Sequence, residues 1–268
     1  MADTDHRQKL MMTDIHSHIL WGVDDGPSTL EEAVQMCKAS AGDGISCMVA
    51  TPHAFDGVHT THQVNFLENR VKEMNEQLGG KPEVRLGCEL RINHDIVKQV
   101  CNDRTAPTLG GGPYILIEFP HYVVPVGSER VFFELMTNSF KPIVAHPERN
   151  RTLMAEPHRF YNMVESGVLG QMDAGSITGK FGAKTEKTAR LMLEHGLIHF
   201  IASDCHNMRN RLPGLSEATT QVAELVGEDV ARSISADNPG AIVDGKQLPW
   251  RPSPVLPEMG RKWWFFNR

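Results

Sequence analysis

Short apolar segments recur along the chain and alternate with longer stretches in which apolar and polar residues are mixed. Each apolar segment is only four to six residues long, which is typical of a buried strand. In chain order these segments are 10–15, 45–50, 84–88, 114–117, 142–145, 168–172 and 197–202. The pattern predicts about seven strands, and a turn or polar residues follow each of them.

The stretches between these segments have the apolar spacing of helices. Ser28-Thr29-Leu30-Glu31 is a capping box, and it precedes an apolar helix face formed by Ala33, Val34, Cys37 and Ala41. Further helices are predicted at about 61–78, 93–101, 128–136, 149–166, 184–195, 216–226 and 229–235. Strands that alternate with helices pair in parallel, so the sequence predicts an α/β fold that is either barrel-like or doubly wound.

The chain length, composition and charge limit the class of protein. A chain of 268 residues without an internal repeat or a linker suits a single domain over 1–268, with a C-terminal tail from about 250 that carries Trp263-Trp264-Phe265-Phe266. The formal net charge of −6 argues against a nucleic-acid-binding surface. No segment is long and apolar enough for a transmembrane helix, and the N-terminus lacks the layout of a signal peptide. Five scattered cysteines favour a cytoplasmic protein over a disulfide framework.

Histidine and acidic residues stand at the ends of six of the seven predicted strands. His16 and His18 are two residues apart and therefore point to the same side of their strand. Asp25 follows on a turn that Gly26-Pro27 sharpens. The remaining residues at strand ends are His53, Glu89, Glu118, His146, Asp204 and His206. In a parallel barrel these ends lie on one face, where barrel enzymes have their active sites.

Several carboxylates on one face repel each other unless cations neutralise them. The set therefore predicts a polynuclear metal site with nitrogen and oxygen ligands, which suits manganese, iron or zinc. Metal ions there would activate water and neutralise an anionic substrate. Arg149 and Arg211 follow two of these strand ends, and guanidinium groups suit phosphate oxygens. Taken one at a time, each residue is better explained as a capping or surface group, and it is the recurrence at the strand ends that favours the metal site.

The motifs DIHSHILWGVDDGP, ATPH, GCEL, YILIEFP, IVAHPERN and IASDCHN occur in this order. Together they resemble the polymerase-and-histidinol-phosphatase (PHP) superfamily. The DDGP, IEFP and HPERN motifs are similar to its bacterial tyrosine phosphatase branch, which is found with capsule and exopolysaccharide systems. The resemblance covers about residues 12–215.

The resemblance implies a distorted (β/α)7 TIM-like barrel, the PHP fold, that binds three divalent metal ions, with manganese favoured and iron or zinc as alternatives. It implies the ligands His16, His18, Asp25, His53, Glu89, Glu118, His146, Asp204 and His206. Glu89 would bridge two metals, and Arg149 and Arg211 would hold the phosphate. The implied activity is metal-dependent hydrolysis of phosphotyrosine, and the implied partner is a bacterial tyrosine autokinase that controls polysaccharide export. Asp173 departs from the family pattern, in which asparagine is expected, and an extra carboxylate there would repel phosphate or change the metal preference.

Three other interpretations stay open at the level of sequence. Cys205 and Arg211 have the spacing of a cysteine phosphatase, although no glycine lies between them and no histidine precedes the cysteine. The same scaffold also suits a small phosphomonoester such as histidinol phosphate, because the surrounding loops, here 121–126, select the leaving group. The third interpretation is a non-catalytic metal-binding regulator whose aromatic tail binds a partner. The sequence predicts neither the oligomeric state nor the role of that tail.

Overall fold

The computed structural model describes residues 10–101 and 106–257. The predicted aromatic segment Trp263-Trp264-Phe265-Phe266 lies outside the described residues. In the described part, residues 251–257 have no regular secondary structure, and the backbone N–H of Val255 donates to the carbonyl of His195 at 2.8 Å. The segment before 257 therefore runs along the end of a helix.

Parallel strands form the centre of the molecule, and they pair in two groups. The strands are β1 (Met12–Ser17), β2 (Ile45–Ala50), β3 (His53–Ala54), β4 (Glu83–Leu86), β5 (Glu89–Arg91), β6 (Tyr114–Glu118), β7 (Lys141–Ala145), β8 (Leu169–Asp173) and β9 (Phe200–Ala202). One group has the order β1-β2-β4 and the other the order β3-β5-β6-β7-β8-β9. Because β3 follows β2 and β5 follows β4 after a two-residue interruption, the two groups form one continuous order. All seven predicted strands are present, and the two additional short strands extend predicted ones.

The two ends of this strand order meet beside the end of β1. The backbone N–H of His18 donates to the carbonyl of Cys205 at 2.9 Å, and the N–H of Asp204 donates to the carbonyl of His16 at the same distance. Ser17 and Cys205 form a parallel bridge. These bonds join the segment after β9 to β1, so the strands follow the cycle of a distorted (β/α)7 barrel, as predicted.

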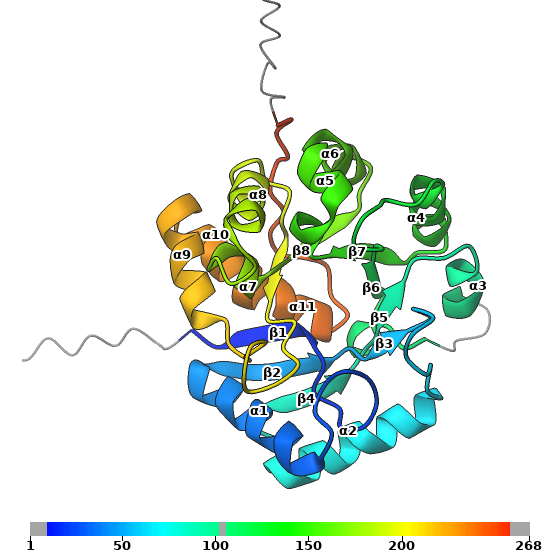
Figure 1. The fold of residues 1–268 in the computed structure, drawn as a ribbon, viewed down its shortest axis with the longest axis vertical. Helices are drawn as coiled ribbons and strands as arrows, with labels where there is room; N and C mark the ends of the chain where they lie inside the picture. Colours follow the sequence, from blue (N-terminus) through cyan, green and yellow to red (C-terminus); the bar gives the residue numbers. More distant parts are fainter. Residues whose placement is uncertain (1–9, 102–105, 258–268) are drawn as a thin grey trace, which may run out of the picture.

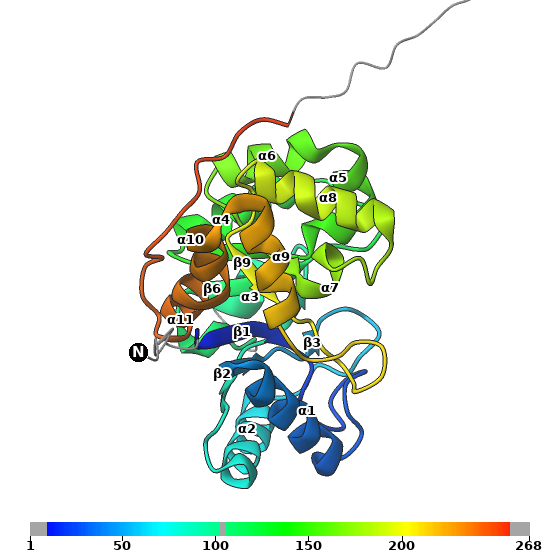
Figure 2. The same ribbon diagram turned by 90° about the vertical axis from the view of Figure 1, so that its left-hand side faces the viewer.

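Helices surround the strands (Figure 1). They are α1 (Leu30–Asp43), α2 (Val64–Leu78), α3 (Ile96–Cys101), α4 (Ser128–Thr137), α5 (Arg151–Ala155), α6 (Pro157–Glu165), α7 (Ala174–Ile177), α8 (Ala183–Glu194), α9 (Ser216–Val226), α10 (Glu228–Arg232) and α11 (Asn238–Val243). Helices α1 and α2 lie below β1 and β2 in Figure 2, and α5, α6 and α8 lie at the opposite end of the molecule. No helix in residues 10–101 or 106–257 is long and apolar enough to cross a membrane.

Alternate strand residues belong to two separate apolar clusters. Leu116 of β6 and Phe200 of β9 are buried in the smaller cluster, together with Ile242 of α11. The neighbouring residues Ile117 and Ile201 belong to the larger cluster, which also contains the buried faces of the outer helices. Because strand side chains alternate in direction, the smaller cluster fills the inside of the barrel and the larger one packs the barrel against its helices.

The predicted helix 149–166 is wrong in one respect, because it is two helices. Helix α5 ends at Ala155 and α6 begins at Pro157, while Glu156 between them is non-helical. Proline lacks the N–H that would continue the first helix, and it disfavours helical backbone in the residue before it.

The capping box is also shifted by one residue. Thr29 is the N-cap of α1 and accepts from the N–H of Glu32, rather than Ser28 pairing with Glu31.

Candidate metal centre

The strand register brings the predicted ligands to one end of the barrel. His53 pairs with Glu89 across β3 and β5, and Arg91 pairs with Glu118 across β5 and β6. Asp204 pairs through its backbone with His16 at the end of β1. In parallel strands these positions all belong to the carboxyl-terminal ends, so histidines and carboxylates converge there as predicted from the sequence.

His16 and His18 lie side by side at the end of β1 and are fully buried. Their Nε2 atoms are 3.3 Å apart. The same two atoms lie 3.3 and 3.4 Å from Oδ1 of Asp204, and each lies 3.4 Å from an oxygen of Glu89. Two imidazole nitrogens and two carboxylates therefore face a common point, as the spacing of the two histidines predicts.

The Nδ1 atom of each of these rings contacts a polar side chain on the side of the ring away from Nε2. Nδ1 of His16 lies 2.8 Å from Oε1 of Gln171 on β8. Nδ1 of His18 lies 2.7 Å from Oδ2 of Asp24. Such contacts fix the ring orientation and leave Nε2 with its lone pair free for a metal, as in metal sites whose histidines bond a carboxylate or carbonyl on the far side. The sequence pattern predicted neither Gln171 nor Asp24.

Asp25, His53 and His206 form the outer part of the site. Oδ1 of Asp25 lies 3.1 Å from Nε2 of His206 and 3.6 Å from Nε2 of His53. Burial raises the pKa of Asp25, but the contacts with His206 outweigh it and lower the pKa to about 2. The turn that places Asp25 requires glycine at position 26, because a Cβ there would lie 2.4 Å from the carbonyl oxygen of His18.

Glu89, Glu118 and His146 form a third part of the site, in which Glu89 also contacts His16 and His18. Nε2 of His146 lies 3.1 Å from Glu89 and 3.8 Å from Glu118. Burial and the repulsion of Glu89 raise the pKa of Glu118 to about 7, even though Arg91 pairs with it at 2.7 Å. Burial and the charge of Arg149 lower the pKa of His146 to about 4, so this ring is held neutral.

Two of these residues have left-handed backbone that is unusual outside glycine. The φ angle is +33° at His146 and +49° at Asp204. Each such conformation costs about 1–3 kcal/mol and persists where the surrounding structure enforces it. Both residues come directly after or close to a strand end, so the strained turns direct their side chains across the mouth of the barrel.

The donor atoms fit divalent cations. Four groups of donors, each with atoms within 4.8 Å of one another, contain all nine predicted ligands: His18, Asp25, His53 and His206; His16, Glu89 and His146; His16, His18 and Asp204; and His53, Glu89 and Glu118. Imidazole nitrogens together with carboxylate oxygens suit manganese, iron and zinc. The repulsion that raises the pKa of Glu118 is the type of cost that bound cations would remove.

The two predicted phosphate-binding arginines meet at Asp204. Nη1 of Arg149 donates to Oδ2 of Asp204 at 2.6 Å and to Oδ2 of Asp173 at 2.9 Å. Arg211 donates to the same oxygen of Asp204, and its other amino group donates to Nε2 of His206 at 2.8 Å. Two guanidinium groups therefore lie beside the candidate ligand Asp204.

A further cluster was not found from the sequence. Nδ1 of His59 lies 2.7 Å from Oδ2 of Asp56, and the ring of His59 stacks on His53 at 4.9 Å between centroids. These three residues could also hold a metal ion. Asp56 and His59 lie in the irregular segment between β3 and α2, where no periodic pattern indicates which side chains point inward.

The structure disfavours Cys205 as a nucleophile. Its side chain is fully buried. Burial and the nearby Asp14 raise the pKa of its thiol well above the usual value. A catalytic cysteine needs a lowered pKa and partial exposure, so the spacing of Cys205 and Arg211 is not that of a working cysteine phosphatase.

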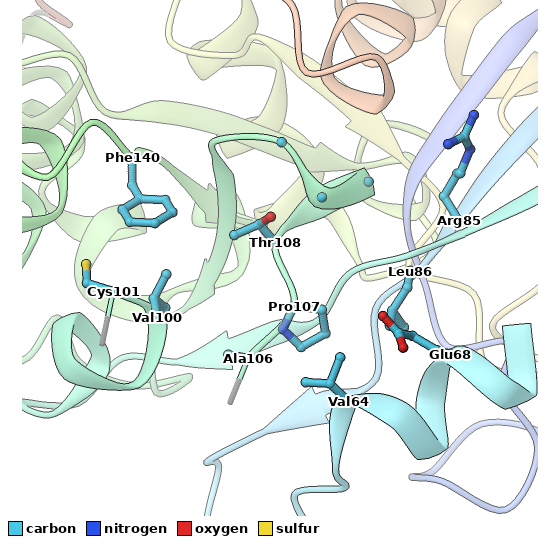
Figure 3. Close-up of a pocket in the computed structure, with 13 residues that line it drawn as sticks. Val64, Glu68, Arg85, Leu86, Val100, Cys101, Ala106, Pro107, Thr108 and Phe140 are labelled. Atoms are coloured by element: carbon cyan, nitrogen blue, oxygen red, sulfur yellow. The ribbon is translucent and has the colours of Figure 1, made fainter. Parts of the chain in front are cut away.

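Two cavities differ in their relation to this centre. One, of about 200 Å³, is lined by residues of the centre that include His53, Glu118, Arg149 and Arg211. The other, of about 690 Å³, has walls from α2, α3 and the glycine turn before β6 (Figure 3). Phe140, which precedes β7, also lines it, so this second cavity lies beside the amino-terminal ends of the strands and away from the candidate ligands.

A parallel α/β barrel with histidines and carboxylates gathered at the carboxyl ends of its strands defines the class of metal-dependent hydrolases. Residues 12–244 match the family model described as "Capsular polysaccharide synthesis, CpsB/CapC". The chain belongs to this family, as the motifs indicated.

The chain is also similar to named proteins and to a solved structure of this family. The chain is 36% identical over 223 residues to the tyrosine-protein phosphatase YwqE of Bacillus subtilis, covering 82% of this chain and 87% of YwqE. It is 34% identical over 202 residues to the putative tyrosine-protein phosphatase CapC of Staphylococcus aureus, covering 75% of this chain and 79% of CapC. A crystal structure from work on YwqE and on CpsB of Streptococcus pneumoniae, described as unique metal-dependent tyrosine phosphatases, superposes with a TM-score of 0.86 at 32% identity. That match covers 91% of this chain and 99% of the other.

More distant structures share the fold alone. An amidohydrolase from Mycoplasma synoviae matches with a TM-score of 0.55 at 12% identity, covering 93% of this chain and 92% of its own.

Proposed function

We propose that this protein is a metal-dependent protein tyrosine phosphatase that hydrolyses phosphotyrosine. The observation that carries the proposal is the centre itself, in which nine histidines and carboxylates lie in overlapping groups beside two arginines. Its relatives YwqE and CpsB have the name of tyrosine-protein phosphatase. The chemistry of the site suits a phosphatase, and the relatives favour phosphotyrosine over histidinol phosphate as its substrate.

The nine ligands would hold three divalent metal ions, with manganese favoured and iron or zinc as alternatives: His16, His18, Asp25, His53, Glu89, Glu118, His146, Asp204 and His206. Bound metals supply an activated water and a positive charge beside the phosphate. Arg149 and Arg211 would bind two of the phosphate oxygens and keep the phosphorus close to that water. The carboxylate of Glu89 lies near four imidazoles, which would suit a ligand shared between metals.

The substrate is proposed to be a phosphotyrosine protein, and specifically a bacterial tyrosine autokinase that controls capsule or exopolysaccharide synthesis. The family description connects this chain with capsular polysaccharide synthesis. The free cysteines at positions 37, 47, 88, 101 and 205 support a place in the reducing cytoplasm, where such a kinase domain would be accessible.

The test is phosphate release from a phosphotyrosine peptide by metal-stripped protein, with Mn²⁺ added back or withheld. We expect activity to return with the metal and to be at least about 100-fold lower in His146→Ala, because that variant removes a ligand of the centre. His158→Ala, which replaces a half-buried histidine on α6 outside the centre, is the matched control. Hydrolysis of histidinol phosphate without any release from the peptide would contradict the proposal in favour of a small phosphomonoester. Inactivity toward both substrates would favour the non-catalytic regulator.

A further inference from the structure

The loop between β6 and α4 is an exposed platform beside the phosphate-binding arginines. It follows Glu118, a candidate ligand, and is anchored by the buried side chains of Phe119 and Val124. Between and after these anchors it presents Tyr122, which is 64% exposed, and Val126, which is fully exposed. A loop with an apolar anchor on each side has a defined shape, so its exposed side chains are held in place rather than spread at random.

The segment that carries Arg149 fixes this loop further. The buried side-chain amide of Asn150 donates to the carbonyls of Pro120 at 2.8 Å and Val123 at 3.1 Å. The backbone N–H of Arg151 donates to the carbonyl of His121 at 3.0 Å. The loop is thus tied to the two residues that directly follow Arg149, and its distance from the phosphate-binding position is set by the fold.

The platform has a positive charge on an aromatic surface. The guanidinium of Arg151 lies 4.4 Å from the centre of the Tyr122 ring, a stacking that keeps the exposed arginine extended over the loop. The ring of His121 packs edge-on against Tyr122 at 5.2 Å. Partial burial and the charges of Arg149 and Arg151 lower the pKa of His121, as expected where two guanidinium groups lie near the ring.

A groove extends the same surface away from the centre. It has a volume of about 480 Å³, and Val126 and Pro125 of the loop form part of its wall. Ile92 and Asn93 form the other side. They follow Arg91, which lines the cavity of the metal centre, so residues next to each other in the chain line the cavity and the groove. Together the cavity and the groove offer more surface than a single phosphotyrosine needs, which suits a polypeptide.

From this arrangement, and resting on the proposed function, we propose that Tyr122 and Arg151 recognise the polypeptide that flanks the phosphotyrosine, with a preference for acidic residues. Tyr122 packs against the chain next to the phosphotyrosine, and Arg151 pairs with a carboxylate of that chain. The two guanidinium groups near His121 make an acidic peptide the matching partner. The platform does not contact the reacting phosphate, so it determines binding of the substrate and not the chemical step.

The test compares three substrates with the full-length, metal-loaded protein: an acidic phosphotyrosine peptide, the same peptide with Gln and Asn in place of Glu and Asp, and p-nitrophenyl phosphate. In Arg151→Gln we expect KM for the acidic peptide to rise about threefold to fivefold and to equal that for the neutral peptide, as for the loss of one exposed ion pair. In Tyr122→Ala we expect KM to rise about fivefold to tenfold for both peptides, because packing against an aromatic ring is lost. In both variants kcat on the peptides and the kinetics with p-nitrophenyl phosphate remain as in the wild type.

Phe133→Ala on α4 and Arg232→Gln on α10 are the matched controls, since both residues are exposed and lie on helices outside the platform. An equal fall in kcat/KM for all three substrates would contradict the proposed recognition and would assign the two residues a structural role. A wild type that cleaves the acidic and neutral peptides with equal KM would also overturn it, while leaving the proposed phosphatase activity in place. A wild type that cleaves p-nitrophenyl phosphate but neither peptide would instead contradict the proposed function itself.

Discussion

The half-buried Arg149 and the buried Asp173 form an ion pair in which Nη1 of the arginine lies 2.9 Å from Oδ2 of the aspartate. The other oxygen of Asp173 accepts the backbone N–H of Gly175 at 2.7 Å, so the carboxylate is fixed from two sides. The carboxylate therefore does not face the metal centre as a free charge. It instead shares the guanidinium that is proposed to bind phosphate.

This pair predicts the effect of replacing Asp173 by the asparagine that the family pattern led us to expect. In Asp173→Asn, Arg149 loses one of its two carboxylate partners, so less of the positive charge of its guanidinium is neutralised. Burial and the charge of Asp204 raise the pKa of Asp173 to about 8. At a pH above 8 we therefore expect phosphate to bind about 1 kcal/mol more tightly, or roughly fivefold, because an opposing charge near the anion is removed. Product inhibition by inorganic phosphate measures this, with Glu217→Gln as a control that removes an exposed carboxylate. Weaker phosphate binding in Asp173→Asn would show that the carboxylate positions Arg149 and does not compete with the phosphate.

The buried position of Cys205 gives a second prediction. In Cys205→Ser, kcat on a phosphotyrosine peptide should stay within about threefold of the wild type, because the thiol is not the nucleophile. The buried hydroxyl costs some stability, so thermal unfolding is measured in parallel to confirm that the variant is folded. A folded variant without activity would restore the cysteine mechanism.

Much of the site was predictable because its residues occupy strand ends. Buried strands are recognisable as short apolar segments, and parallel pairing brings their carboxyl ends together whatever the order of the strands. His53 and Glu89, which are 36 residues apart in sequence, are therefore paired neighbours in β3 and β5. The fold class followed from the same alternation of strands and helices.

The residues that the sequence did not reveal are positioned by irregular backbone or act behind the ligands. Asp24 and Asp25 are adjacent and chemically identical, and only the turn decides that one holds His18 from behind while the other faces His206. Gln171 lies inside the buried strand β8, and nothing in the sequence distinguishes it from the other residues of that strand. The break at Pro157 is a different case. Proline is a recognisable helix-breaking signal, but the prediction followed the apolar spacing of 149–166 instead.

The contact between Gln171 and His16 gives a third prediction. Oε1 of Gln171 accepts from Nδ1 of His16 at 2.8 Å and so leaves Nε2 for a metal. In Gln171→Ala the ring of His16 loses this contact, and we expect the affinity for Mn²⁺ to fall about 10- to 100-fold. Activity measured against Mn²⁺ concentration should show a higher half-saturation value with the same maximal rate. A lower maximal rate at saturating metal would contradict an effect through metal affinity alone.

The last prediction concerns stability and pH and depends on His199, which lies before β9, away from the candidate ligands. Its backbone N–H donates to the carbonyl of Gly170 at 2.8 Å, and its Nδ1 accepts the N–H of Gly170 at 3.2 Å. Burial, with a smaller contribution from the charge of Arg251, lowers the pKa of His199 from 6.5 to about 3. The folded protein thus keeps this ring neutral at a pH where the unfolded chain binds a proton.

Below pH 6.5 the unfolded state gains stability from this proton, so the contribution of His199 to the free energy of unfolding is full above 6.5 and is lost as the pH falls toward 3. At about pH 5.5 the loss is about 1.4 kcal/mol. His199→Asn keeps an acceptor for the N–H of Gly170 but has no titratable group. Urea unfolding at about pH 7.5 and 5.5 should therefore show a smaller decrease in the variant than in the wild type, by about that amount. Because the ligand histidines titrate in both proteins, the difference between the two decreases isolates His199, and equal decreases would contradict its burial as a neutral ring.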